Sequence, residues 1–323
     1  MSRAEEIAAS PLRTRIYVDG YNLYYGCLKS TPYKWLDLMV LFERCILPSS
    51  APAASELLPL SIKFFTAKIL EKASRALDSV SSQARDHTAL RKLYSGRIDI
   101  IEGYYSLTES KAKLIDPAAP ATWPRHGQET LVWKLEEKQS DVNLALQAYH
   151  DAITGEVEQV VIVTNDTDIA PALSLIRSHT QVQIGLVVPA RHQQRIPNSE
   201  LAELAHWVRT HITLAELATA QLPRVIPGRK PTMKPESWYA RPDLLEQVLV
   251  LAIPVTGNRG KAFKWMEEPN PHLDGKAPIE LVETESGAAQ VIMYIERYRQ
   301  HLAEIIRPAD MNPADRDLPP DRS

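Results

Sequence analysis

Hydrophobic positions along the first two thirds of the chain follow two alternating patterns. The apolar runs Arg15–Asp19, Gln159–Thr164 and Val182–Val188 predict strands, and the last two have the continuous apolar character of strands buried on both faces. Ser140–Ile153 and Asp168–Ser178 instead carry apolar residues at helical spacing. Because strands alternate with helices, we expect a doubly wound, mostly parallel sheet of the α/β class.

The rest of the chain completes this fold and adds a second domain. Further strands are expected at 60–65, 98–105, 129–134 and 207–212, further helices at 36–46, 74–94 and 199–206, and loops at 49–59 and 116–127. The pattern divides the 323 residues into an α/β domain over 14–215, a Pro-rich basic linker over 216–240, a small all-helical domain over 241–305 and a disordered tail over 306–323.

The composition excludes several classes of enzyme. Among 12 glycines there is no G-x-G pair and no Gly-Lys followed by Ser or Thr, so neither common phosphate-binding loop is present. The 2 cysteines are too few for a zinc ribbon, and the 9 histidines form no H-E-x-x-H. With no membrane span and a net charge of −3, we expect a soluble cytoplasmic protein that binds nucleic acid only through a local patch.

Four acidic residues are expected at one edge of the sheet. Asp19 ends the first strand, Asp166 and Asp168 follow the strand at 159–164, and Asp141 begins a helix. Ligands of doubly wound sheets bind at this edge, and carboxylates that converge there repel one another unless a cation joins them. All-oxygen ligation favours Mg²⁺ or Mn²⁺, which would activate water for phosphodiester hydrolysis. A simpler interpretation stays open, in which each acid caps a helix or closes a turn.

Three short blocks at this edge resemble the NYN domains of the PIN-like nuclease superfamily. They are Val18–Leu23, Lys138–Val142 and Val163–Asp168, which follow the family's D-x-x-N, K-x-x-D and third acidic block in order and placement. The chain departs from the family at Asn165 and Ile169, where the family usually has glycine and an aromatic residue. The resemblance covers about residues 14–212.

This resemblance implies a PIN-like Rossmannoid fold and a metal-dependent endoribonuclease. The residues that it assigns to the site are Asp19, Asp141, Asp166 and Asp168 as ligands of Mg²⁺ or Mn²⁺, Asn22 to orient a ligand or water, and Lys138 near a phosphate. RNA is the expected partner, since a nuclease positions its substrate through phosphate contacts. Arg191 and Arg195 on a basic loop could contact phosphates and Tyr21 could stack on a base, although a solvated loop and a packed tyrosine are equally ordinary roles.

The C-terminal helical region resembles the toxin-binding domain of the Xre/MbcA/ParS antitoxins. The matching pattern runs from Trp265 through Pro269-Asn270 and Pro278 to Gly287. The resemblance implies a protein partner, either a RES-type toxin or a second copy of the chain, with Trp265 and Asn270 as contact residues.

Three hypotheses for function follow. The first is a metal-dependent ribonuclease with a C-terminal interaction module. The second is a non-catalytic regulatory or toxin–antitoxin protein whose acidic site is vestigial. The third is a pyridine-ring hydroxylase on the same scaffold, which ranks lowest because no dinucleotide fingerprint supports a flavin or NADH site.

Overall fold

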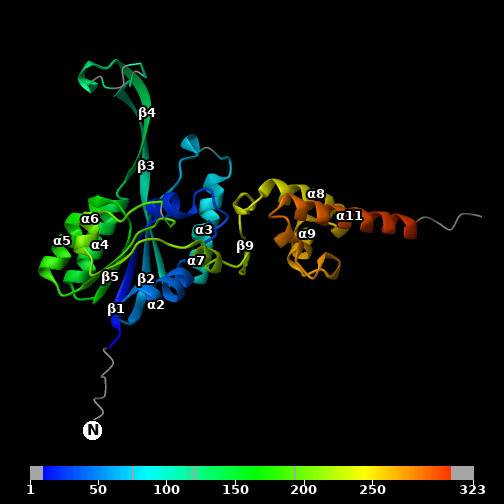
Figure 1. Ribbon diagram of the computed structural model, residues 1–323, viewed down its shortest axis with the longest axis horizontal. Coiled ribbons are helices and arrows are strands. Elements are labelled where there is room, and N and C mark those ends of the chain that lie inside the picture. Colours follow the sequence, from blue (N-terminus) through cyan, green and yellow to red (C-terminus); the bar gives the residue numbers. More distant parts are fainter. Residues whose placement is uncertain are drawn as a thin grey trace, which may run out of the picture. The chain divides into compact units, whose positions relative to one another are not determined.

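The computed structural model describes residues 10–306 apart from residues 75, 116, 119, 120, 122 and 193. The chain divides into two compact units after Trp238 (Figure 1). Apart from residue 306, the tail expected over 306–323 lies outside the described residues. In the described part of the chain, no helix combines the length and apolar character needed to cross a membrane.

The first unit is built on a seven-stranded sheet in the order β4-β3-β2-β1-β5-β6-β7. Its strands are β1 (Leu12–Asp19), β2 (Ser55–Ala67), β3 (Ile98–Lys113), β4 (Glu129–Lys138), β5 (Gln159–Val163), β6 (Gln183–Val187) and β7 (Trp207–Arg209). All neighbours are parallel except β3 and β4. The expected α/β class with a mostly parallel sheet is confirmed, and the chain order reverses between β1 and β5, where such sheets bind ligands.

Helices cover both faces of this sheet. The α-helices of the unit are α1 (Gly20–Leu23), α2 (Leu47–Ser50), α3 (Ser79–Leu93), α4 (Ser140–Ile153), α5 (Ala170–His179), α6 (Ser199–Leu204) and α7 (Leu214–Thr219). Short π- and 3₁₀-helical segments lie at Tyr24–Leu28, Val40–Ile46, Glu71–Ala73, Pro124–His126, Thr167–Ile169 and Glu236–Trp238. Ile16 and Val18 of β1 pack into one core with α3, while Tyr17 between them faces the core formed with α4 and α5.

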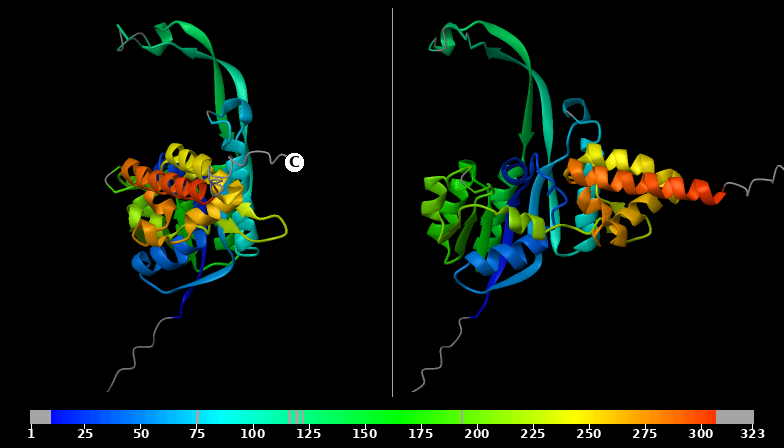
Figure 2. Two further views of the ribbon diagram at one scale, coloured as in Figure 1. Left: turned by 90° about the vertical axis from the view of Figure 1, so that its right-hand side faces the viewer. Right: turned by 45° about the vertical axis from the view of Figure 1, so that its right-hand side comes forward.

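The two edge strands extend beyond the sheet as a paired arm (Figure 2). The parallel pairing of β3 with β2 ends at Gly103, but β3 continues to Lys113 in antiparallel register with β4. The expected strand at 98–105 and the short edge strand at 129–134 were therefore both too short. The second half of β3 has no continuous apolar run. It is held extended by its backbone hydrogen bonds to β4.

The Pro-rich stretch expected as a linker over 216–240 is ordered on the first unit. A small hairpin of β8 (Val225–Ile226) and β9 (Thr232–Met233) lies beside α3, and Lys92 Nζ donates to Thr232 Oγ1 at 2.8 Å. Trp35 Nε1 also donates to the carbonyl of Pro223 at 2.9 Å. Proline in the sequence indicates an extended path but carries no information about these long-range contacts.

The second unit is helical, as expected. It consists of α8 (Pro242–Thr256), α9 (Arg259–Glu267), a 3₁₀ turn (Pro271–Leu273), α10 (Pro278–Leu281) and α11 (Glu285–Ile306). Its core contains Val248, Met266 and Val291, all fully buried. Gly287 lets α11 approach the end of α10, since a Cβ there would lie 2.1 Å from the carbonyl oxygen of Leu281.

Candidate active site

Asp19 lies where the carboxyl ends of β1 and β5 meet. It is the last residue of β1, is 4% exposed and caps the N-terminus of α1. Its Oδ1 accepts from the Asn22 backbone N–H at 2.9 Å, and its Oδ2 accepts from Asn22 Nδ2 at 2.6 Å and from Thr164 Oγ1 at 2.9 Å. The carboxylate is therefore held in place by three donors of the protein itself.

The other predicted acids gather around Asp19. Asp141 lies in the first turn of α4, while Asp166 and Asp168 lie in the turn after β5, where Asp166 Oδ1 accepts from the Asp168 backbone N–H at 3.2 Å. Burial and then repulsion by Asp19, Asp166, Glu137 and Asp168 raise the pKa of Asp141 to about 6. Burial raises the pKa of Asp19 as well, and Asp166 adds to this shift. The structure thus brings the four predicted acids to one acidic rim, formed by Asp19, Asp141, Asp166 and Asp168.

In the described structure, the acidic rim does not bring three possible ligand atoms within 4.8 Å of one another. Among the described residues, only His150, Asp151 and Glu156 bring three possible ligand atoms within 4.8 Å of one another, and they lie at the far end of α4. A metal site of three or more ligands needs its donor atoms about one coordination sphere apart.

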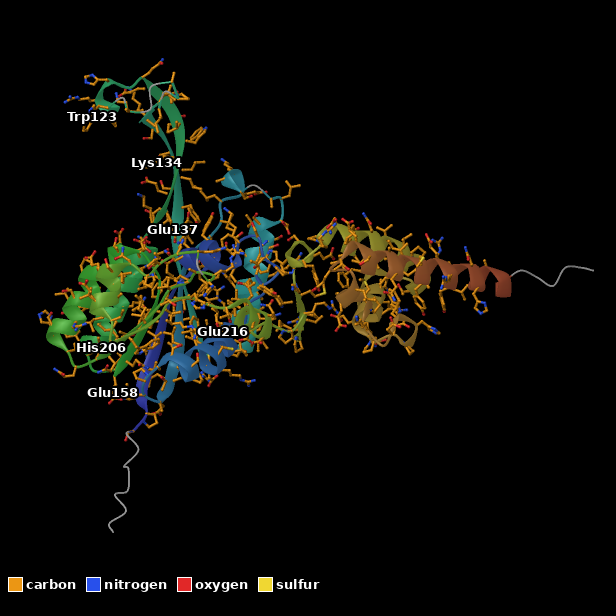
Figure 3. All side chains as sticks on the ribbon, viewed as in Figure 1. Trp123, Lys134, Glu137, Glu158, His206 and Glu216 are labelled. Carbon is orange, nitrogen blue, oxygen red and sulfur yellow. The ribbon has the colours of Figure 1, made fainter. Side chains whose placement is uncertain are left out.

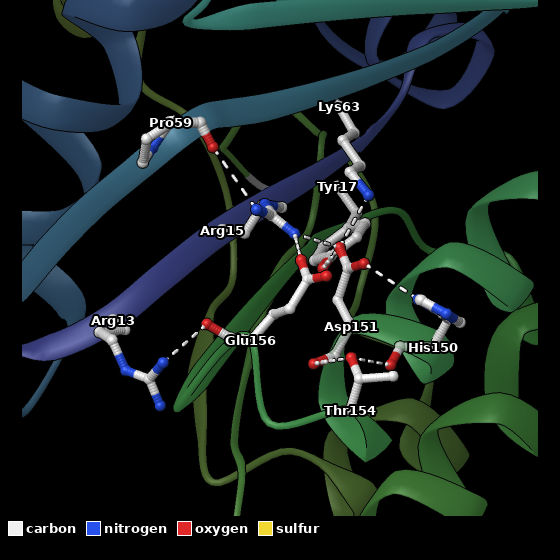
Figure 4. A network of polar contacts seen from close by, with 9 residues as sticks. All are labelled: Arg13, Arg15, Tyr17, Pro59, Lys63, His150, Asp151, Thr154 and Glu156. Atoms are coloured by element: carbon white, nitrogen blue, oxygen red, sulfur yellow. Dashed lines mark hydrogen bonds and ion pairs between the residues drawn. The ribbon is translucent and has the colours of Figure 1, made fainter.

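The group around Asp151 is an ion-pair network rather than a cation site (Figure 4). Asp151 Oδ2 accepts from Arg15 Nη1 at 2.6 Å, from the Tyr17 hydroxyl at 2.6 Å and from Lys63 Nζ at 2.7 Å. Burial opposes ionisation of Asp151, but the hydrogen bonds from Lys63, Tyr17 and Arg15 outweigh it and lower its pKa. Two cations already neutralise this carboxylate, so it braces β1, β2 and α4.

A cavity of about 320 Å³ lies beside the acidic rim. Its aromatic wall is formed by Tyr21, Tyr24, Tyr25, Phe64, Tyr105 and Trp238. The rings of Tyr21 and Tyr25 lie 4.4 Å apart between centroids, and Tyr24 meets Tyr25 edge to face at 5.2 Å. Glu137, which is labelled in Figure 3, lies at the base of the arm. It belongs to the cavity and also acts on the pKa of Asp141, so cavity and rim are neighbours. The volume and the apolar lining are typical of a site for one small ligand.

Lys34, Asp78, Asp86 and Glu137 give this cavity its polarity. Lys34 is the only lysine or arginine among its described lining residues, and burial lowers its pKa. Asp86 Oδ1 and Glu137 Oε1 are buried without a hydrogen-bond partner in the described structure. Burial raises the pKa of Asp86 to about 8, and burial followed by repulsion from Asp19 raises the pKa of Glu137.

Sequence reasoning missed these cavity residues. The sequence offered one indication of Asp86 as a site residue. Asp86 lies four residues after Ser82 and four before Leu90, so it shares the face of α3 on which these two residues are buried. Lys34 and Glu137 had none, since nothing in their local sequence separates them from surface charges.

Two of the predicted phosphate contacts are engaged with neighbouring side chains. Arg191 Nε donates to Gln194 Oε1 at 3.1 Å, and Lys138 Nζ pairs with Glu136 at 3.3 Å. Arg191 and Arg195 lie near Cys27, where they oppose the increase in thiol pKa that burial causes. Tyr21 belongs to the cavity wall.

The two residues predicted to bind a partner have different roles in the second unit. Trp265 lines a cavity of about 310 Å³ with Tyr294 and Tyr298, and its ring stacks on Tyr294 with centroids 6.2 Å apart. Asn270 is buried and caps the 3₁₀ turn, where its Oδ1 accepts from the His272 backbone N–H at 2.9 Å. Asn270 therefore shapes the turn, and Trp265 is the one available to a ligand.

Comparisons with known proteins give one near-complete match and one local match. The chain is 61% identical over 301 residues to the 6-hydroxy-3-succinoylpyridine 3-monooxygenase HspA of Pseudomonas putida (strain DSM 28022 / S16), covering 91% of this chain and 96% of the relative. Residues 251–300 match the C-terminal toxin-binding domain of the Xre/MbcA/ParS antitoxins. A crystal structure of a protein of unknown function from Vibrio parahaemolyticus is 16% identical with a TM-score of 0.35, over 66% of this chain and 96% of that one.

These matches correct the main functional prediction and confirm the C-terminal one. The first relative is named as a monooxygenase, so the prediction of an endoribonuclease that uses Mg²⁺ or Mn²⁺ is wrong, and so is that of a nuclease acting on RNA. The lowest-ranked hypothesis, a pyridine-ring hydroxylase, is the one that the relative supports. The antitoxin-type module at the C-terminus is confirmed, while an NYN classification of the first unit stays a prediction.

Proposed function

Because the chain belongs to the family of the Pseudomonas putida 6-hydroxy-3-succinoylpyridine 3-monooxygenase, we propose that it hydroxylates a hydroxypyridine that carries an acidic acyl side chain. The observation that carries the proposal is the cavity beside the acidic rim, which combines an aromatic wall with one lysine and three carboxyl groups. These three features correspond to the ring, the acidic side chain and the polar edge of such a substrate.

The aromatic wall suits the ring, and Lys34 suits the side chain. Stacked and edge-to-face tyrosines offer flat apolar contacts to a heteroaromatic ring. A succinoyl group ends in a carboxylate, and Lys34 is the cation of the described cavity wall that can pair with it.

Monooxygenation transfers one oxygen atom of O₂ to the substrate and reduces the other to water, so it needs a two-electron donor such as a reduced flavin or nicotinamide.

The β1–α1 turn, where Rossmann-type sheets hold a pyrophosphate, does not suit a dinucleotide here. Asp19 already caps the N-terminus of α1 with a carboxylate, and the other rim acids would repel phosphate. Gly20 packs against β2, since a Cβ there would lie 2.7 Å from the carbonyl oxygen of Phe65. We therefore assign no dinucleotide to this turn.

The test is turnover of 6-hydroxy-3-succinoylpyridine by the purified full chain. O₂ uptake is followed with NADH or NADPH, with and without added flavin, and the absorbance spectrum of the protein reports any flavin that purifies with it. Lys34→Gln should raise KM by about 10–100-fold with a smaller change in kcat, because the lost ion pair holds the substrate without taking part in oxygen transfer. Lys34→Arg is the matched control and should retain most of the affinity. Absence of O₂ uptake with every donor, or an unchanged KM in Lys34→Gln, would contradict the proposal.

We also propose that the second unit binds a protein partner, which the antitoxin-type match at 251–300 supports. A RES-type toxin and a second copy of the chain are the two candidates. Co-purification of the full chain with a RES-type toxin, and light scattering of the chain alone, distinguish them. Trp265→Ala should weaken the complex, whereas Met293→Ala on an exposed position of α11 should not.

For the first unit we propose a PIN-like classification, in which the scaffold carries oxygenase instead of nuclease chemistry. The support is that the three NYN-like blocks contribute Asp19, Asp141, Asp166 and Asp168 to one edge of a mostly parallel sheet. An NYN-domain alignment built on measured structures would test this classification.

A further inference from the structure

Asp86, which is half-buried, differs from the buried acids of the first unit. Asp151 is paired with Arg15 and Lys63, Asp19 accepts from Asn22 and Thr164, and Asp37 accepts from the Tyr94 hydroxyl. Asp86, in contrast, has a buried Oδ1 without a partner among the described residues. A buried polar atom left without a hydrogen bond is costly, so its retention calls for an explanation.

The position of Asp86 supplies that explanation, because Asp86 lines the cavity proposed for the substrate. It lies in the middle of α3, and its neighbours in the cavity wall include Gln83, His87 and Phe64. The Gln83 side chain is committed elsewhere, since it donates to the Ala67 carbonyl and accepts from the Ile69 N–H. Gln83 therefore does not satisfy the Asp86 carboxyl group, which leaves it for a ligand that enters the cavity.

Resting on the proposed function, we propose that the Asp86 carboxyl group recognises the cyclic amide edge of the hydroxypyridine ring. A pyridine with a hydroxyl group next to its ring nitrogen exchanges with a lactam, which presents an N–H donor beside a C=O acceptor. A protonated carboxyl group presents the complement, an O–H donor and a C=O acceptor, so the two groups can form a pair of hydrogen bonds.

The surroundings of Asp86 favour this protonated form. Burial raises its pKa to about 8, and no described lysine or arginine forms an ion pair with it. A neutral acid that both donates and accepts satisfies two polar atoms of the ligand at once. A site built this way discriminates strongly against an analogue that lacks them, because its own polar atoms are then left unpaired.

The experiment measures binding by calorimetry without reductant, so that it does not depend on turnover. The probes are 6-hydroxy-3-succinoylpyridine and 3-succinoylpyridine, which lacks the hydroxyl group. Wild type should prefer the hydroxylated ring by about 10–100-fold, the value of two buried hydrogen bonds. Asp86→Leu should abolish that preference by weakening only the hydroxylated ligand.

Asp86→Asn is the decisive variant, because a carboxamide also pairs one donor and one acceptor with a lactam. It should keep the affinity of wild type to within about 3-fold, since the number of hydrogen bonds is conserved. If Asp86→Asn loses as much affinity as Asp86→Leu, a charged carboxylate is required and the inference is overturned. Thermal melting of both variants establishes that they are folded.

Glu137 provides the matched control, since its Oε1 is the other unpartnered carboxyl oxygen of the cavity. Selective loss of the hydroxylated ligand in Glu137→Leu but not in Asp86→Leu would assign recognition to Glu137 and overturn the inference. Equal affinity of wild type for both probes would overturn the inference alone and leave the proposed function standing. Failure of wild type to bind either probe would overturn both.

Discussion

Replacing Asp86 by asparagine should make the protein more stable at neutral pH, an unusual outcome for a substitution in the wall of a ligand cavity. Burial raises the pKa of Asp86 from 3.8 to about 8, so the folded protein holds a proton that the unfolded chain releases. As the pH rises between these two values, the unfolded state gains from ionisation and the folded state does not. The free energy of unfolding of wild type therefore falls across this window.

The size of the effect follows from the width of the window. Each pH unit between the two pKa values changes the free energy of unfolding by about 1.4 kcal/mol. At pH 7, about three units above the pKa in the unfolded chain, the cost is roughly 4 kcal/mol, and the partial exposure of Asp86 to solvent reduces it. We expect Asp86→Asn to be about 1–3 kcal/mol more stable than wild type near neutrality, with the difference vanishing below about pH 4.

Urea unfolding at several pH values between about 4 and 8 measures this difference. Tryptophan fluorescence is a suitable signal, because Trp35, Trp123, Trp133, Trp207 and Trp238 lie in the first unit and only Trp265 lies in the second. Asp86→Asn should therefore gain stability while it keeps its affinity for the lactam ring.

Asp78 is the control, since it lies just before α3 but has the opposite electrostatics. Hydrogen bonds from Ser237 and Ser82 lower its pKa, so its contribution to stability is present at neutral pH and is lost as the pH falls through that lowered pKa. Asp78→Asn should therefore be less stable than wild type at pH 7. If Asp86→Asn is destabilised as Asp78→Asn is, or if its stability relative to wild type does not increase with pH, Asp86 is ionised in the folded protein and the reasoning fails.

Two further predictions concern the scaffold. Asp151→Asn should lower the free energy of unfolding by about 3–5 kcal/mol in the same urea assay, because it leaves Lys63 buried without its counter-ion and Arg15 with only the half-exposed Glu156. Glu156→Gln, which removes that half-exposed partner alone, should cost far less. Gly26→Ala should lower the melting temperature strongly, since a Cβ at Gly26 would lie 1.7 Å from the Pro189 carbonyl oxygen, whereas Gly260→Ala, with its nearest contact at 3.4 Å, should be tolerated. A melting temperature of Gly26→Ala equal to that of wild type would contradict the close approach of these two backbones.

The sheet and the acidic rim could be predicted because their information is local. Each buried strand is a continuous apolar run, and each rim acid directly follows a strand or begins a helix, as Asp19 and Asp141 do. The arm formed by β3 and β4 could not, because its polar second half has no apolar periodicity and is extended only through its partner. The hairpin at 225–233 could not be predicted either, because its two short strands have no apolar periodicity and are extended only through each other.

The cavity could not be predicted because its walls come from distant parts of the chain. Lys34 precedes the Val40–Ile46 segment, Asp86 lies in α3, Glu137 ends the arm and Trp238 closes the first unit. No spacing rule connects these positions, and only folding brings them to one side of the acidic rim. The signal that existed was a single acid on the buried face of a helix, and an unpartnered acid cannot be told from a paired one without the structure.

The error about metal has a specific physical origin. Converging carboxylates were expected to need a cation, but Asp19 receives three hydrogen bonds from Asn22 and Thr164, and burial and mutual repulsion raise the pKa of Asp141 to about 6. Asn22 and Thr164 thus stabilise the Asp19 carboxylate with hydrogen bonds, without a cation. The same rim also repels anions, so the carboxylate of the proposed substrate is expected at Lys34, away from the rim. Positions 3 and 6 of a pyridine lie opposite each other, so an acyl group held at Lys34 directs the lactam edge of the ring across the cavity, toward a second polar group such as Asp86.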